Sequence, residues 1–353
     1  MTDRPHSAMP TAEPAYAQAG VNQVAADEAV DAIVRGLKTI ALSRPSRQIL
    51  PSGHFANVIQ LSDDIGIALS TDGVGTKLLV AEQLGSYDTV GIDCIAMNVN
   101  DVICVGAEPL ALLDYIAIDH ADPEICEAIG IGLARGAELA EIEIPGGELA
   151  QLGDMVKGFD LAGACFGVID PKKIVAGQAI QPGDSIIGLP SRGLHANGYT
   201  LARSALEGIP LNSDPEGRLG SSLGDVLMKP TEIYVKPVME LLRSDCDVNG
   251  LAHITSLGFD NLLRLHANVG YVIDSPLPVP PIFQLIQERG SVSDEEMREV
   301  FNLGCGFCCV VAAETEVRAL NLLQKHYPEA RKIGHVVAGD HVVNSPANWP
   351  SAS

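Results

Sequence analysis

The spacing of apolar residues predicts helices and short strands that alternate along the whole chain. In residues 26–40 the apolar side chains of Ala29, Ile33, Val34 and Leu37 share one helical face. The same spacing predicts further helices at residues 78–84, 89–105, 123–141, 201–206, 230–242, 259–264, 282–288, 294–301 and 316–325. Strands are predicted at residues 65–69, 110–118, 161–168, 269–273, 307–312 and 332–337, and at the end of the segment 180–189. This mixture in both halves predicts an α/β fold.

The length of 353 residues is sufficient for two domains that each bury a core. We place the boundary near residues 176–183, so that one domain spans 16–176 and the other 177–343. Residues 1–15 and 344–353 are polar or proline-rich, and we expect both tails to be disordered.

The charge balance narrows the class of function. With 45 acidic and 23 basic residues, the net charge of −22 disfavours binding to nucleic acid or to an anionic membrane. Aromatic residues make up only 4% of the chain, which also disfavours stacking on single-stranded nucleic acid. No signal-peptide pattern opens the chain and no apolar stretch reaches membrane-spanning length, so we expect a cytoplasmic protein. An anionic substrate would need local basic groups, backbone N–H groups or magnesium.

The eight cysteines include one C-x-x-C pair, Cys305 and Cys308. The pair lies in an apolar, strand-like segment with no second pair and no histidine nearby. We therefore interpret these residues as buried thiols in a reducing compartment, rather than as a zinc or redox site.

The segment from Ser70 to Lys77 (Ser-Thr-Asp-Gly-Val-Gly-Thr-Lys) joins a predicted strand to a predicted helix. Its glycines would let backbone N–H groups approach an anion, and a helix N-terminus attracts negative charge. Lys77 could contact phosphate oxygens, and Asp72 could hold a magnesium ion that bridges them. The spacing is not that of a Walker loop, and a tight turn with a surface lysine is the alternative.

Polar residues also occupy one face of the apolar helix predicted at 89–105. Asp93, Met97, Asn100 and Asp101 fall at i, i+4, i+7 and i+8. Carboxylate and amide oxygens suit a hard cation, so this face is a candidate for metal or nucleotide binding. The alternative is that these side chains hydrogen-bond the backbone at a helix end or an interface.

Three further segments carry candidate contacts. In residues 191–200, Ser191, His195 and Asn197 offer donors before a predicted helix, and Arg192 adds positive charge. An N-capped helix after a polar turn is the alternative there. The loops that contain Glu148 and the pair His253 and Thr255 supply further polar groups.

Several long motifs resemble the aminoimidazole ribonucleotide synthetases, also called phosphoribosylformylglycinamidine cyclo-ligases. In chain order they are TDGVGTKL (71–78), GIDCIAMNVNDVICVGAEPLALLDYIA (91–117), FDLAGACFGVID (159–170), GLHANGYTLAR (193–203), KPTEIYVKPVMELL (229–242), GLAHIT (250–255) and EEMREVFNLGCGF (295–307). The resemblance implies two α/β halves, a mixed N-terminal sheet, and a homodimer in which two such sheets form a β-barrel. It also implies that ATP and Mg²⁺ activate the formyl amide oxygen of formylglycinamidine ribonucleotide. The amidine nitrogen then closes the imidazole ring, and ADP and phosphate are released.

The resemblance also implies roles for individual residues. Magnesium ligands would be Asp72, Asp93 and Asp101. Catalytic residues would be Asp72, Lys77, Asp101 and His253. Nucleotide contacts would be Lys38, Asp72, Gly73, Gly75, Thr76, Lys77, Asp93 and Asn100. Substrate contacts would be Glu148, Ser191, His195, Asn197 and Thr255.

Four segments depart from the family pattern. The glycine-rich stretch after the first helix keeps few glycines around Gly53. The family loop GGETAEMPG reads GGELAQLG at residues 146–153, so Glu148 is kept while a threonine and a glutamate are lost. Ser256-Leu257-Gly258 replaces three glycines, and Leu262-Leu263 replaces an Ile-Pro pair. Leu257 adds bulk where backbone could approach a ligand.

Two other functions therefore stay open. One is a related enzyme that phosphorylates another oxygen; the first cysteine is Cys94, which disfavours selenophosphate synthetase, and the chain is too short for the glutamine-using relative. The other is a catalytically silent paralogue that binds nucleotide or a partner chain.

Overall fold

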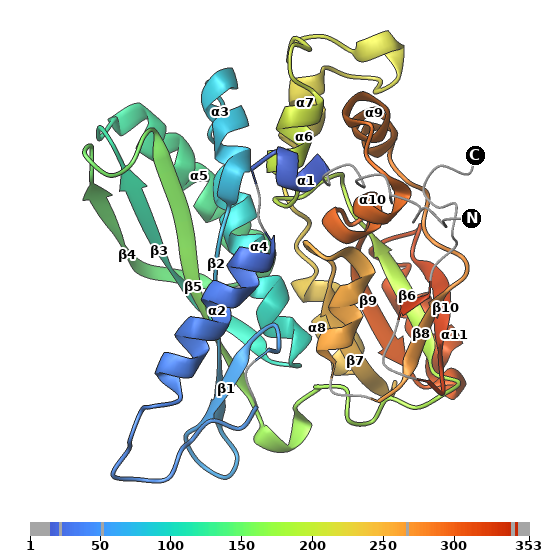
Figure 1. The fold of residues 1–353 in the computed structure, drawn as a ribbon. Coiled ribbons are helices and arrows are strands. Elements are labelled where there is room, and N and C mark those ends of the chain that lie inside the picture. The colour runs from blue at the N-terminus through green and yellow to red at the C-terminus, as the bar shows by residue number, and fades with distance from the viewer. Residues whose placement is uncertain (1–14, 21–22, 51–52, 266–267, 340–342, 345–353) are drawn as a thin grey trace, which may run out of the picture.

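The computed structural model describes residues 15–20, 23–50, 53–265, 268–339 and 343–344, which form two sheets with helices packed between and around them (Figure 1). Of the two tails predicted to be disordered, residues 1–14 and 345–353 lie outside the described residues. Ala15 begins the short helix α1 (Ala15–Gln18), and Asn344 ends strand β11 (Val343–Asn344). The predicted domain boundary falls between Ile169 and Ser185, where the chain leaves the first sheet for the second.

The N-terminal sheet is mixed, as predicted. Its order is β1-β2-β5-β3-β4, and only β3 and β4 run parallel. The strands are β1 (Asn57–Gln60), β2 (Gly66–Gly73), β3 (Glu108–Ile118), β4 (Glu143–Gln151) and β5 (Phe159–Ile169). Helix α5 (Pro123–Ala140) makes the crossover between β3 and β4.

The prediction of a loop around Glu148 was wrong, because these residues form edge strand β4. Its two glycines hide the strand pattern in the sequence, yet Gly147 pairs with Asp114 and Glu148 pairs with Tyr115. A Cβ atom at Gly147 would lie 2.2 Å from the Asp114 carboxylate, so a larger residue there would displace the Asp114 side chain.

The C-terminal sheet has the order β11-β8-β10-β6-β9-β7. Its other strands are β6 (Ser185–Pro190), β7 (Val248–His253), β8 (Gly270–Ile273), β9 (Cys305–Val311) and β10 (Arg331–Val337). The helices of this half are α6 (Tyr199–Ala205), α7 (Leu223–Leu227), α8 (Val235–Leu242), α9 (Pro281–Gly290), α10 (Asp294–Val300) and α11 (Glu316–Leu323), and residues 258–264 form a 3₁₀ helix. Strand β7 was not predicted, and α8 begins at Val235 rather than at Pro230, because residues 229–234 run along α4.

Helix α4 (Val90–Cys104) lies between the two halves (Figure 1). It packs on β2, β3 and β5 on one side and on β7 and α8 on the other. A helix that is covered on all sides must be apolar all round, which explains its run of Ile, Val, Ala and Cys. Any polar side chain on α4 must find a partner inside the protein.

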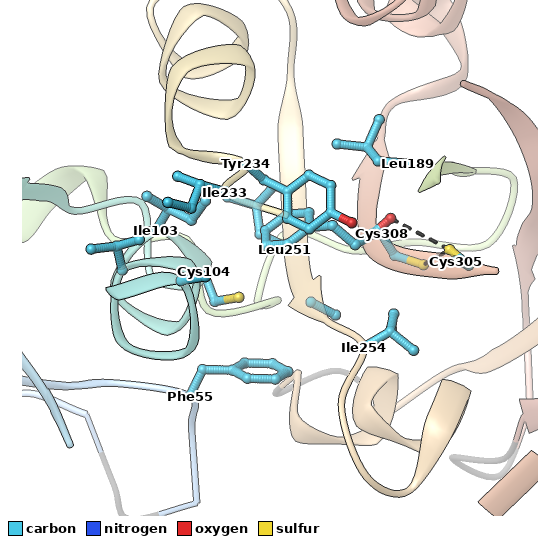
Figure 2. Close-up of a cluster of buried hydrophobic side chains, with 14 of the residues drawn as sticks. Phe55, Ile103, Cys104, Leu189, Ile233, Tyr234, Leu251, Ile254, Cys305 and Cys308 are labelled. Atoms are coloured by element: carbon cyan, nitrogen blue, oxygen red, sulfur yellow. Dashed lines mark hydrogen bonds between the residues drawn. The ribbon is translucent and has the colours of Figure 1, made fainter. Parts of the chain in front are cut away.

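A buried cluster continues this contact into the C-terminal half. Figure 2 shows Phe55 and the α4 residues Ile103 and Cys104 on one side, with Tyr234 and Leu251 on the other. The thiols of Cys305 and Cys308 lie at one end of the cluster, with 3.8 Å between their Sγ atoms. The prediction that these thiols are buried is confirmed, and burial raises the pKa of Cys308 well above its usual value.

Helix α2 (Gln23–Leu37) forms where predicted, but its apolar face is not covered. Val30, Ile33 and Leu37 are 57%, 62% and 58% exposed. Helix α3 (Leu78–Leu84), by contrast, buries Leu78, Val80 and Ala81. None of the described helices is both long and apolar enough to cross a membrane.

Candidate functional site

Asp72 and Asp101 lie at the junction of the two halves, and the charge of Asp101 acts on the Asp72 carboxylate. Asp72 is on β2, and Asn98 of α4 fixes its backbone by accepting from Asp72 N at 3.0 Å and donating to Asp72 O at 3.1 Å. One Asp72 oxygen accepts from Gly73 N at 2.7 Å. Burial, and then the nearby charge of Asp101, raise the pKa of Asp72 to about 6. A cation would stabilise two carboxylates whose charges oppose each other in this way.

His253 orients Asp101. Its Nδ1 lies 2.9 Å from Asp101 Oδ1, and the ring is fully buried. Its Nε2 lies 3.5 Å from the Asn100 amide nitrogen, which can only donate. The proton is therefore on Nδ1, and His253 donates to Asp101. The predicted catalytic histidine holds a carboxylate in place rather than facing an open site.

Arg264 supplies positive charge to the acidic pair. Its guanidinium lies 4.9 Å from the centre of the Phe55 ring, and its charge acts to lower the pKa of Asp72. We did not predict it as a site residue, although it ends the segment Asn261-Leu-Leu-Arg264 that resembles the family pattern. Asn98 was also missed, because its role depends on the backbone that lies beside it.

Asp72 and Asp101 fit a magnesium site as two oxygen ligands from different elements. No group of three or more His, Cys, Asp or Glu residues in the described part of the chain is arranged to hold a metal. Asp72 and Asp101 could supply two oxygen ligands to Mg²⁺, and water and phosphate oxygens would supply the others.

Lys77 and Asp93 do not join this pair, contrary to the sequence prediction. Both side chains are fully buried, and Lys77 Nζ lies 2.7 Å from Asp93 Oδ2. The ammonium also donates to the carbonyls of His195 and Lys229, at 3.2 and 2.7 Å. Asp93 Oδ1 accepts from the amide and hydroxyl of Thr231, at 2.7 and 2.6 Å.

Burial raises the pKa of Asp93 and lowers the pKa of Lys77, and each partner's charge opposes that shift. With its donors used in this way, Lys77 is not placed to meet a phosphate, and Asp93 is not placed to bind a metal. Eight residues separate Asp93 from Asp101 along α4, which is about 12 Å. The Lys77–Asp93 ion pair instead links the first half of the chain to the second through His195, Lys229 and Thr231.

Asn100 and His195 also serve this junction rather than an open site. Asn100 donates to Glu232 O at 2.8 Å and accepts from Tyr234 N at 3.0 Å. His195 is buried with its Nε2 near the amide of Arg192 at 3.3 Å, and burial lowers its pKa well below the usual value. A neutral, enclosed imidazole is poorly suited to the predicted substrate contact.

The other predicted residues are divided among different parts of the surface. Asn197 accepts from Ser256 Oγ at 3.2 Å, next to Thr255, so these polar groups share one loop region. Ser191 donates to Asn302 at 2.8 Å. Glu148 is exposed and pairs with Tyr115, on the face of the sheet opposite to Asp72. Lys38 lies in an exposed turn after α2, and no hydrogen bond or ion pair in the described structure joins it to the acidic pair.

The turn after Asp72 keeps the open backbone that the sequence predicts. Gly75 has φ +71°, and no atom lies within 4 Å of where its Cβ would be. Thr76 is exposed and its hydroxyl lies 3.1 Å from that of Thr200. Gly75 thus leaves open space in the turn that follows Asp72.

A fourth carboxylate, that of Asp114, was not predicted. It lies in the same row of the sheet as Asp72, with Gly163 between them. Burial raises its pKa. Asp114 lies in the Leu-Leu-Asp-Tyr part of a motif that matches the family, and this match could have identified it as a candidate.

Leu257 sits at φ +74°, a backbone conformation that favours glycine, and is 40% exposed. Replacing it with glycine should relieve this strain and stabilise the protein by about 0.5–1 kcal/mol, after the entropic cost of glycine. Leu303 is the matched control, since it also has positive φ, at 46°, but is fully buried. Leu303→Gly should destabilise by about 2 kcal/mol or more. Urea denaturation of both variants measures this, and a destabilised Leu257→Gly would refute the strain.

Each half of the chain matches a model of one domain of a known protein family. Residues 53–169 match the family model described as AIR synthase related protein, N-terminal domain, and residues 181–344 match its C-terminal domain. The phosphoribosylformylglycinamidine cyclo-ligase of Methanothermobacter thermautotrophicus is 52% identical over 279 residues, covering 78% of this chain and 81% of that protein. That of Methanocaldococcus jannaschii is 45% identical over 326 residues, covering 91% and 92%.

Solved structures agree on the fold. AaThiL complexed with AMPPCP and TMP has a TM-score of 0.61 at 17% identity, covering 89% of this chain and 91% of that chain. The hydrogenase maturation protein HypE in complex with ATP has a TM-score of 0.57 at 17% identity, covering 81% and 83%. The resemblance drawn from the motifs is confirmed, and the chain belongs to the AIR synthase related family.

Proposed function

We propose that this chain is a phosphoribosylformylglycinamidine cyclo-ligase. It would convert formylglycinamidine ribonucleotide and ATP to 5-aminoimidazole ribonucleotide, ADP and phosphate, in de novo purine biosynthesis. The main support is that relatives 44–52% identical over most of the chain carry that name. The paired carboxylates of Asp72 and Asp101 agree with a reaction that transfers a phosphoryl group.

In this proposal Asp72 and Asp101 hold Mg²⁺, which would neutralise charge on the phosphates of ATP. His253 and Asn98 position these two carboxylates through their hydrogen bonds. Arg264 would replace Lys77 as the cation for the phosphoryl group, because its charge acts at Asp72 and Lys77 is already bound by Asp93. The open turn at Gly75 would approach the phosphates with its backbone.

The substrate contacts stay predictions. Asn197 and Thr255 are retained as the substrate side, because their loops lie together. Ser191 and Glu148 keep their proposed role as substrate contacts, and Lys38 keeps its proposed role as a nucleotide contact.

The function is tested by incubating the protein with ATP, magnesium and formylglycinamidine ribonucleotide. We expect ADP and aminoimidazole ribonucleotide to form in equal amounts. ADP without the imidazole product would instead indicate a related kinase with another acceptor. Nucleotide binding without either product would indicate a silent paralogue.

The pKa of Asp72 predicts the pH dependence. Because this pKa is raised to about 6, Asp72 binds a proton below that pH and loses affinity for a cation. Both kcat/KM and Mg²⁺ affinity should be steady above pH 7 and should fall about tenfold per pH unit below 6. A titration of Mg²⁺ at pH 5 and pH 8 checks this. Equal affinities would show that Asp72 is not a ligand.

We also propose that the chain forms a homodimer through the N-terminal sheet. The face of this sheet opposite to α4 carries exposed apolar side chains, with Leu113 and Tyr115 40% and 45% exposed. The uncovered apolar face of α2 lies in the same half of the chain (Figure 1). Such surface is unusual on a monomer and is normally covered by a partner.

Replacing Tyr115 with aspartate should therefore yield monomers in sedimentation analysis, because a charge would have to be buried in the contact. Val317→Asp is the control, since Val317 is exposed on α11 in the other half. A parent chain that sediments as a monomer, or a Tyr115→Asp variant that stays dimeric, would contradict this contact.

A further inference from the structure

A side-chain hydrogen bond joins two loops that follow different strands of the C-terminal sheet. Ser256 lies in the loop after β7, Asn197 lies in the loop after β6, and Ser256 Oγ is 3.2 Å from Asn197 Oδ1. The family pattern has glycine at position 256, and glycine has no side chain that could make this bond. The link between the loops therefore depends on a residue at which this chain departs from the pattern.

The neighbours of Asn197 fix the orientation of its amide. Asn197 Nδ2 lies 3.7 Å from Met97 Sδ, and a thioether sulfur can accept a hydrogen bond weakly but cannot donate one. The NH₂ group therefore faces Met97, and the carbonyl oxygen faces Ser256. It follows that the Ser256 hydroxyl is the donor in the bond between the loops.

This amide lies close to the residues proposed to hold the metal. Met97 is four residues before Asp101 on α4, which places the two on one face of the helix and about 6 Å apart along its axis. His253, three residues before Ser256, donates to Asp101. Both loops thus meet α4 within about one turn of Asp101, so a small substrate bound there would be within reach of the Asn197 amide.

The backbone of Ser256 is held from behind by a buried asparagine. Asn261 is fully buried, and its Nδ2 donates to Ser256 O at 2.7 Å and to Gly258 O at 2.9 Å. Gly258 packs closely on the next helix, since a Cβ atom there would lie 2.0 Å from Arg298 O. A backbone held in this way keeps the Ser256 hydroxyl within reach of Asn197.

We infer, on the basis of the proposed function, that Ser256 is a positioning residue that acts through Asn197. By donating to Asn197 Oδ1 it holds the amide so that the NH₂ group is the part offered to the substrate. Because Oδ1 is already occupied, Asn197 contacts an acceptor on the substrate, namely a hydroxyl, carbonyl or phosphate oxygen. Holding the amide before the substrate arrives lowers the cost of ordering it on binding.

The test is the steady-state kinetics of position 256 variants. Ser256→Ala should raise KM for formylglycinamidine ribonucleotide about threefold to tenfold, with kcat and KM for ATP unchanged. Ser256→Thr keeps the hydroxyl and should restore the parent KM. Asn197→Asp keeps the acceptor for Ser256 but removes the NH₂ group, so it should raise KM at least as much as Ser256→Ala. Ser244→Ala is the control, because it removes a partly buried hydroxyl that donates to Leu241 O at 2.6 Å, away from both loops.

A double variant separates positioning from a general structural role. In the Asn197→Ala background, Ser256→Ala should cause no further rise in KM, because Ser256 acts through the side chain that is already gone. Additive effects, an unchanged KM in Ser256→Ala, or the same rise in Ser256→Thr would overturn the inference.

Hydrogen exchange tests the link between the loops without the reaction. Amides of residues 193–198 and 255–258 should exchange faster in Ser256→Ala than in the parent, and at the parent rate in Ser244→Ala. A parent chain that forms no aminoimidazole ribonucleotide would refute the proposed function, whereas unchanged exchange in Ser256→Ala would by itself refute the role of Ser256.

Discussion

Asp72→Asn should lower kcat/KM by about 10²- to 10³-fold without destabilising the protein. The loss is expected because an amide cannot replace a charged ligand of the metal that neutralises the phosphates. Stability should be unchanged or slightly higher, because burial and Asp101 already disfavour the charged form of Asp72. Steady-state kinetics and urea denaturation of the same preparation measure both effects.

Asp114→Asn is a control for this variant, because Asp114 lies in the same row of the sheet with its pKa also raised by burial. We do not assign Asp114 to the metal, so its loss should lower kcat/KM far less than the loss of Asp72. Wild-type rates for Asp72→Asn at saturating magnesium would remove Asp72 from the mechanism. The acid limb of the pH profile should also disappear from the residual activity of Asp72→Asn.

Lys77→Met should destabilise the protein by about 3–5 kcal/mol. The substitution leaves the Asp93 carboxylate buried without its counter-charge, and such a charge is far more costly than the pair. It also removes the donor for the carbonyls of His195 and Lys229, which ties the two halves together. Thermal and urea denaturation measure the change.

The double variant Lys77→Met with Asp93→Asn should recover about 1.5–3 kcal/mol of that loss, because the lone charge is gone while Thr231 keeps an acceptor. These values are what an interdomain ion pair predicts. If Lys77→Met unfolded like the parent but lost affinity for ATP, the phosphate contact first predicted from the sequence would be correct instead.

Elements with strong periodicity could be predicted from the sequence. Helices α4 and α5 and strands β3 and β5 lie within two residues of their predicted bounds, since long apolar patterns outweigh local exceptions. Strand β4 could not be predicted, because Gly146 and Gly147 weaken its pattern and only pairing with β3 explains it. The exposed face of α2 was missed for a different reason. Periodicity shows that a helix has an apolar face but not what covers it.

The site shows the same limit. The sequence placed Asp72 beside a turn and Asp101 on a helix face, and the family resemblance grouped both with Asp93 as metal ligands. The role of Asp93 depends on its hydrogen bonds with Thr231, which lies 138 residues later in the chain, and on how the two halves pack. Spacing along α4 put Asp93 and Asp101 on similar faces, but their partners lie at opposite ends of the helix. Arg264 was also missed because its position depends on long-range packing against Phe55.

The location of the metal tests the central claim most directly. Crystals grown with Mn²⁺ and a non-hydrolysable ATP analogue would locate the ion by its anomalous scattering. We predict a manganese peak bound by the carboxylates of Asp72 and Asp101, with Lys77 still paired to Asp93. A peak bound by Asp93, or an ordered nucleotide whose metal contacts neither Asp72 nor Asp101, would contradict this account.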